Sequence, residues 1–99
     1  MNPPLVLFAR IRPKPEHYDT CRRALLEVVP LTRAEPGCRA FALHEAEPAD
    51  GTLYLYEVFD DQAALDAHLA APYMQPLFEG FGTWLEAPVD GVKTRPLEA

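Results

Sequence analysis

Two titratable side chains in the sequence each interrupt an apolar pattern, and together they could carry out proton transfer. Glu57 lies within the apolar run Leu53–Phe59, and His68 lies one helical turn after Leu65. If a strand and a helix place both on one buried layer, the two side chains can meet; burial would raise the pKa of the Glu57 carboxyl group, whereas a protonated histidine beside it would lower that pKa. We expect His68 to act as a general base, with Glu57 orienting or charge-balancing the imidazole. A buried His–Glu pair can instead serve only to join a helix to a sheet.

An aromatic segment after His68 could form a surface for a flat ligand. Aromatic and methionine side chains commonly line small-molecule pockets, although the same residue types also fill protein cores. His44, near the end of a predicted strand, is a further candidate for ligand contact. The sequence has no glycine-rich phosphate loop, Ser-His-Asp order or metal-ligand spacing, so we expect no metal and no cofactor. The residues expected to bind a substrate are Phe59, Tyr73, Met74, Phe78, Phe81, Trp84 and His44.

These candidate residues depend on elements that hydrophobic periodicity and turn residues predict. Short apolar runs indicate strands, and apolar residues three or four apart indicate helices. Pro30 conflicts with the interior of the first helix because it removes a hydrogen bond, so we expect either a kink or a separate last turn there. The predicted order is a strand at Leu5–Ile11, a helix from Pro15 to the Glu35-Pro36-Gly37 turn, strands at Cys38–Glu45 and 52–59 joined by a turn at 48–51, a helix at 62–70, a short helix or irregular cap at 73–84 and a strand at about 86–95.

The resulting β-α-β-β-α-β order is that of the ferredoxin-like arrangement, an α+β fold. Its four strands make one antiparallel sheet, and its two main helices cover one face of that sheet. A chain of 99 residues suits one hydrophobic core, so we expect a single domain over residues 1–99.

The strand at 52–59 indicates a partner on the second face of the sheet. Side chains alternate along a strand, so Tyr54, Tyr56 and Val58 lie on the face opposite Glu57. Both faces are largely apolar, yet the helices can cover only one of them. A second copy of the chain is the simplest cover, because symmetric homodimers are the commonest oligomers. Alternatively, the two tyrosines keep their hydroxyl tips in water and the face stays open.

Composition narrows the range of partners. The formal net charge of -6 opposes binding to nucleic acid. No apolar run approaches the roughly 20 residues that a membrane helix needs, and the first residues lack the layout of a signal peptide. Cys21 and Cys38 fit no ligand pattern, as expected of two reduced thiols. We therefore expect a cytoplasmic protein with no nucleic-acid or membrane partner.

Two segments follow a pattern that is fairly specific to one protein family. One is the turn Arg33-Ala34-Glu35-Pro36-Gly37-Cys38, and the other runs from Tyr56-Glu57-Val58-Phe59 to Ala67-His68-Leu69. Together they resemble the antibiotic biosynthesis monooxygenase (ABM) domain family, including its quinol monooxygenases, over nearly the whole chain. The resemblance implies a dimeric α+β barrel in which two sheets pack face to face. It also implies a cofactor-independent monooxygenase that uses molecular oxygen and a small aromatic phenol or quinol.

The chain departs from this family at two positions. Tyr73 stands where a histidine often follows the proline that ends the second helix, and Phe59 stands where the strand often has tryptophan. The haem-degrading branch has an Asn/His/Trp constellation, and the only asparagine here is Asn2, so we expect no haem. Two other functions stay open. A pocket filled by side chains would favour a non-catalytic metabolite-binding or stress-associated dimeric domain, and a wet, polar pocket would favour an isomerase of a small polar metabolite.

Overall fold

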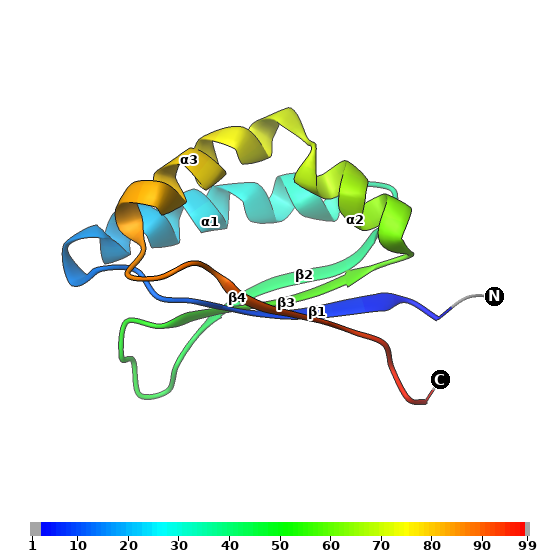
Figure 1. Ribbon diagram of the computed structural model, residues 1–99, viewed down its shortest axis with the longest axis horizontal. Coiled ribbons are helices and arrows are strands. Elements are labelled where there is room, and N and C mark those ends of the chain that lie inside the picture. The colour runs from blue at the N-terminus through cyan, green and yellow to red at the C-terminus, as the bar shows by residue number, and fades with distance from the viewer. Residues whose placement is uncertain (1–2, 99) are drawn as a thin grey trace.

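The computed structural model describes residues 3–98; Asn2, on which the expectation about haem depends, lies outside them. Four strands form one antiparallel sheet, and the helices lie together on one of its faces (Figure 1). This is the predicted ferredoxin-like α+β fold. Short 3₁₀ turns precede α1 and α3, at Pro15–His17 and Pro72–Met74. The main elements are, in chain order, β1 (Leu5–Ile11), α1 (Tyr18–Arg33), β2 (Cys38–Glu45), β3 (Leu53–Phe59), α2 (Gln62–Leu69), α3 (Gln75–Trp84) and β4 (Asp90–Thr94).

The sheet places β3 in an interior position. The strand order is β2-β3-β1-β4, so β3 is hydrogen-bonded on both sides. Within it, Glu57 pairs with Leu7 of β1 and Phe41 of β2. The predicted turn between β2 and β3 is present, and Gly51 adopts a φ of 87° there, a left-handed conformation that a residue without Cβ tolerates. Glu57 therefore lies well inside the sheet, away from its edges.

Helix α1 packs one stripe of side chains against the sheet and runs through Pro30. Cys21, Leu25, Val28 and Thr32 are buried at three- or four-residue spacing. The helix continues without interruption to Arg33, so of the two alternatives expected at Pro30, a kink or a separate last turn, the second is wrong. Pro30 is exposed, and water can therefore bind the carbonyl group that loses its partner one turn earlier.

The second half of the chain is more regular than expected in one place and less in another. The segment after Pro72 forms a true helix, α3, because Pro76 falls in its first turn, where a missing N–H costs nothing. The final strand is shorter than expected and begins at Asp90. Before it, Leu85 bridges to Pro13, and the chain then passes through Pro88, which cannot donate to a strand ladder.

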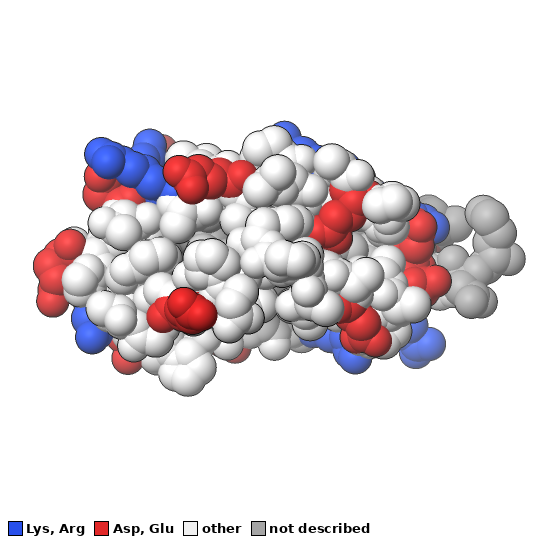
Figure 2. Space-filling model, turned by 90° about the horizontal axis from the view of Figure 1, so that it is seen from above, with Lys and Arg blue, Asp and Glu red and all other residues white. Residues whose placement is uncertain are grey.

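The helical side of the molecule has few charges at its centre. Seen from above the helices, uncharged side chains dominate, with Asp and Glu scattered among them and Lys and Arg mostly at the margins (Figure 2). None of the helices in residues 3–98 combines the length and hydrophobicity that crossing a membrane requires.

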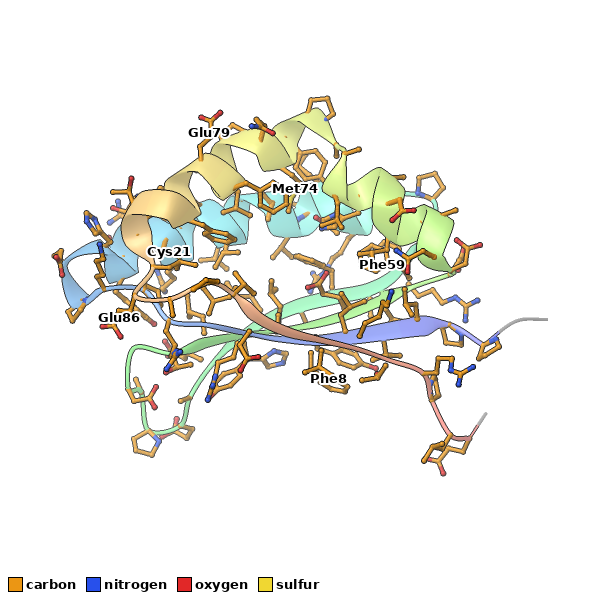
Figure 3. The ribbon with its side chains drawn as sticks, in the orientation of Figure 1. Phe8, Cys21, Phe59, Met74, Glu79 and Glu86 are labelled. Atoms are coloured by element: carbon orange, nitrogen blue, oxygen red, sulfur yellow. The ribbon has the colours of Figure 1, made fainter. Side chains whose placement is uncertain are left out.

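The opposite face of the sheet carries no helix and is apolar, as the alternation along β3 predicts. Phe8 and Val92 are 52% and 55% exposed there, and Tyr54 and Tyr56 are each 39% exposed. The rings of Phe8 and Tyr56 lie 5.6 Å apart between centroids. Phe8 projects from this face, whereas Phe59 lies between α2 and the sheet and Met74 lies among the helices (Figure 3). We refer to the surface formed by Phe8, Tyr54, Tyr56 and Val92 as the open face.

Candidate functional site

A cavity of about 390 Å³ lies between the sheet and the helices, with walls from β1, β2, β3, β4, α1, α2 and α3. This volume falls within the range of about 300–1,000 Å³ that is common for small-molecule sites. Its lining is apolar except for Glu57 and His68. Three large apolar side chains of the lining are partly exposed, and they mark the mouth: Leu69, Phe78 and Val89. The arrangement suits a flat apolar ligand that carries a few polar atoms.

Glu57 supplies one polar group of the cavity. Its residue is only 7% exposed, and no residue among 3–98 forms a hydrogen bond with its carboxyl group. Within the same residues, every side-chain nitrogen or oxygen that is completely buried has a hydrogen-bond partner. The unpartnered carboxyl oxygens of Glu57 are therefore not completely buried, and they open onto the cavity that this residue lines. Burial raises the pKa of Glu57 to about 7. Near neutral pH the group can therefore either hold or release a proton.

His68 supplies the other polar group, and a different carboxylate orients it. Its Nδ1 lies 3.0 Å from Oε2 of Glu35, and its ring packs at centroid distances of 5.6 Å from Phe41 and 5.1 Å from Phe59. A carboxylate only accepts hydrogen bonds, so Nδ1 carries a proton, and in the neutral form of the ring Nε2 is then a free acceptor. No described residue forms a hydrogen bond with Nε2. Like the carboxyl oxygens of Glu57, this nitrogen is therefore not completely buried, and it opens onto the cavity that His68 lines.

The expected direct contact between His68 and Glu57 is therefore corrected. The carboxylate that forms a hydrogen bond with His68 belongs to Glu35. Glu57 faces the cavity from the sheet and forms no hydrogen bond with His68. The physical reason is the position of the turn after α1, which brings Glu35 up to the buried side of α2. Glu57 and His68, the two polar residues predicted from the sequence, still line one cavity. Each can therefore contact a ligand there independently of the other.

Two hydroxyl groups complete the surroundings of Glu35. The Tyr73 hydroxyl donates to Oε2 of Glu35, and it lies 3.1 Å from Oγ1 of Thr32. Because Tyr73 has one hydroxyl proton, Thr32 is the donor in the second hydrogen bond. Burial, followed by the hydrogen bond to Glu35, raises the pKa of Tyr73 to about 12, so the phenol stays protonated as a donor. We call Thr32, Tyr73, Glu35 and His68 the Glu35 network.

Gly37 allows the turn to approach α2 closely enough for this contact. A Cβ on Gly37 would collide with the side chain of Ala64, which lies one helical turn before His68 on α2. The carbonyl oxygen of Gly37 also accepts a hydrogen bond of 2.9 Å from the amide of Asp60, just before α2. The position of Glu35 is thus set by close backbone packing two residues away.

The remaining predicted site residues divide into two groups. Met74, Phe78 and Phe81 line the cavity. Phe59 lies beneath the His68 ring, and Tyr73 takes part in the Glu35 network. Trp84 covers Gly80 and meets Phe81 edge to face, with centroids 6.5 Å apart. These last three do not line the cavity.

His44 lies on the other side of the sheet from the cavity. It borders a separate hollow of about 440 Å³ in the open face, together with Tyr54 and Tyr56. The ion pair between Arg10 and Asp90, with 3.0 Å between nitrogen and oxygen, lies at the same hollow. The structure therefore does not bring His44 near His68 or Glu57.

The fold and the cavity do not by themselves name a function, but comparison with known proteins identifies the family of the chain. The family described as antibiotic biosynthesis monooxygenase matches residues 4–79. The chain belongs to this ABM family.

The relatives support this assignment over the full length. "Putative monooxygenase Rv0793" of Mycobacterium tuberculosis is 33% identical over 98 residues, which cover 99% of this chain and 96% of the relative. Its solved structure has a TM-score of 0.91 and covers 97% of each chain. "Putative monooxygenase YcnE" of Bacillus subtilis is 30% identical over 90 residues, 91% of this chain and 95% of the relative. The crystal structure of PA3566 from Pseudomonas aeruginosa has a TM-score of 0.92 at 30% identity and covers 99% of this chain and 98% of that one.

Proposed function

We propose that the protein is a cofactor-independent monooxygenase that oxidises a small aromatic phenol or quinol with O₂. The observation that carries this proposal is the apolar cavity of about 390 Å³ whose two polar lining residues are Glu57 and His68. Apolar walls suit an aromatic ring, and a free imidazole nitrogen suits removal of a hydroxyl proton. Membership of the ABM family supports the reaction class.

The reaction balances with the substrate as the only reductant. Nε2 of His68 takes the hydroxyl proton, and the aromatic anion gives one electron to O₂. The resulting radical and superoxide combine to form a carbon–oxygen bond, and the peroxide takes the proton back from His68. Loss of the ring C–H proton breaks the O–O bond, so one oxygen atom leaves as water and the other remains as a carbonyl group. A quinol thus yields a hydroxyquinone and water, and all four electrons come from the quinol.

Glu57 has a separate role in this scheme. Its acid form donates a hydrogen bond to a second oxygen of the substrate, and its carboxylate form accepts one. Because burial raises the pKa of Glu57 to about 7, both forms are populated near neutral pH. A quinol, which has two oxygens, makes use of both Glu57 and His68, whereas a simple phenol engages one of them.

The same cavity argues against the two alternative functions. A non-catalytic domain would be favoured if Phe78, Phe81 and Trp84 filled the space, but the first two only line it and Trp84 lies outside the lining. An isomerase of a polar metabolite needs a polar pocket, and this lining has two polar residues.

A homodimer formed through the open face is part of the proposal. Four large apolar side chains are exposed together there, and such a patch on a small protein commonly marks an interface. Two copies packed sheet to sheet would cover it while leaving the mouth between α2, α3 and β4 on the outer side. Light scattering at micromolar concentration is expected to give twice the chain mass of 11.1 kDa. A monomer under these conditions would contradict this part.

Oxygen uptake with a panel of hydroquinones and naphthoquinols tests the catalytic part. We expect O₂ uptake to be faster than the uncatalysed reaction and to consume one O₂ per quinol. For His68→Ala we expect kcat to decrease by about 10²–10⁴-fold. His17→Ala is the matched control, because His17 lies in the turn before α1 and does not line the cavity. Uptake at the uncatalysed rate with every quinol, or an unchanged rate in His68→Ala, would overturn the proposal.

A further inference from the structure

We propose that Tyr73 is a positioning residue, which acts through Glu35 to keep His68 in the form with Nδ1 protonated and Nε2 free toward the cavity. Tyr73 does not line the cavity and so does not act on a ligand there directly. Its effect on the reaction rests on the proposed function, but its effect on the histidine does not.

Two hydrogen-bond donors meet at one carboxylate oxygen of Glu35. Oε2 of Glu35 accepts from both Nδ1 of His68 and the Tyr73 hydroxyl. Two donors on one carboxylate oxygen fix its position more narrowly than one, because rotation of the carboxyl group would break both hydrogen bonds. Thr32, which is fully buried, in turn fixes the Tyr73 oxygen through its own hydroxyl.

The tautomer of the His68 imidazole depends on its hydrogen bond to Glu35. The contacts of the ring with Phe41 and Phe59 restrict its plane, but aromatic contacts do not distinguish one nitrogen from the other. Among residues 3–98, only the hydrogen bond from Nδ1 to Glu35 distinguishes them. If Glu35 turns away, the ring can adopt the other tautomer, in which Nε2 carries the proton and cannot accept one from a substrate.

The position of Tyr73 in the chain lets it join separate helices. It comes from the 3₁₀ turn Pro72–Met74 between α2 and α3, whereas Glu35 follows α1 and His68 lies on α2. The hydroxyl therefore ties the end of α1 to the connection between the other two helices. This explains why a tyrosine at this position reaches the site without facing the ligand space.

Tyr73→Phe tests the inference, with Tyr18→Phe as the matched control. Tyr18 also donates to a carboxylate, Oε2 of Glu45 at 2.7 Å, but at the other end of α1 and outside the cavity. The nitrogen–proton correlation NMR spectrum of the labelled histidine rings reports the tautomer, recorded above the pH at which histidine ordinarily titrates. We expect His68 to be Nδ1-protonated in the wild type and in Tyr18→Phe, and to become a mixture of tautomers in Tyr73→Phe.

The kinetic readout separates this inference from the proposed function. In Tyr73→Phe we expect kcat for a quinol to fall about tenfold with little change in KM, and no further fall when the substitution is added to His68→Ala. Thr32→Val, which keeps the side-chain shape, is expected to shift the tautomer in the same direction to a smaller extent, and it serves if Tyr73→Phe does not fold. An unchanged His68 tautomer in both variants would overturn the inference. A shifted tautomer in a protein that oxidises no quinol would support the inference and overturn the proposed function.

Discussion

The replacement of Glu57 by glutamine should remove a pH-dependent destabilisation of the protein. Burial raises the pKa of Glu57 from 4.5 to about 7 in the folded state. One pKa unit corresponds to about 1.36 kcal/mol, so ionisation of this group costs the folded state about 3 kcal/mol. The folded state binds the proton more tightly than the unfolded state does. The cost is therefore absent below about pH 4.5, grows as the pH rises, and is complete above about pH 7.

Urea unfolding of the wild type and Glu57→Gln at two pH values, at equal protein concentration, measures this term. Relative to wild type, the variant should gain about 2.5 kcal/mol in unfolding free energy between about pH 5, where a small part of the cost is already present, and about pH 8.5. Glu79→Gln is the matched control, because Glu79 is exposed on α3 and points away from the sheet (Figure 3). If the unfolding free energies of Glu57→Gln and Glu79→Gln, each relative to wild type, change with pH in parallel, burial does not raise the pKa of Glu57.

Three further predictions follow from the packing of the turn after α1, the start of α2 and the open face. Gly37→Ala should lower the unfolding free energy by about 1–3 kcal/mol in urea titrations, because the new methyl group collides with Ala64; it should also weaken the His68 tautomer preference. Asp61→Ala should cost about 1 kcal/mol, since the Asp61 side chain accepts a 2.9 Å hydrogen bond from the Ala64 amide at the start of α2; an unchanged urea midpoint would contradict this. Phe8→Asp should convert a dimer to monomers in sedimentation experiments, and a dimer of unchanged affinity would show that the open face is not the interface.

The fold could be predicted largely from the sequence because its local signals agree. The apolar run of β3 and the turn residues between β2 and β3 each specify one conformation. The failures occurred where a local signal was overridden by its surroundings. Pro30 did not separate the last turn of α1 from the rest of the helix, because its side of the helix faces water. The final strand begins at Asp90, later than the predicted start near residue 86, because Leu85 pairs with Pro13 and Pro88 then interrupts the ladder.

The candidate site could be predicted only in part. Alternation along β3 and periodicity along α2 correctly assigned Glu57 and His68 to the buried layer between sheet and helices. Periodicity carries no information about contacts between separate elements, so it could not identify Glu35 as the partner of His68. The Glu35-Pro36-Gly37 sequence contained a signal, since a glycine beside a helix can permit close approach, but that signal does not name the residue approached.

Residues of the aromatic segment were the hardest to assign. Met74, Phe78 and Phe81 line the cavity, while Tyr73 and Trp84 pack elsewhere. All of them are large and mostly apolar, and the direction in which each projects depends on where α3 begins after its 3₁₀ turn. A shift of one residue rotates a helical side chain by about 100°, which is enough to move it from the cavity to another surface.

The most direct test of the central claim is the fate of isotope-labelled O₂ during oxidation of a naphthoquinol. If the cavity formed around His68 and Glu57 carries out monooxygenation, mass spectrometry will find one labelled oxygen atom in the hydroxyquinone formed by the wild type and none above background with His68→Ala. A quinone without labelled oxygen, accompanied by hydrogen peroxide, would contradict the account, as would equal labelling by the wild type and His68→Ala.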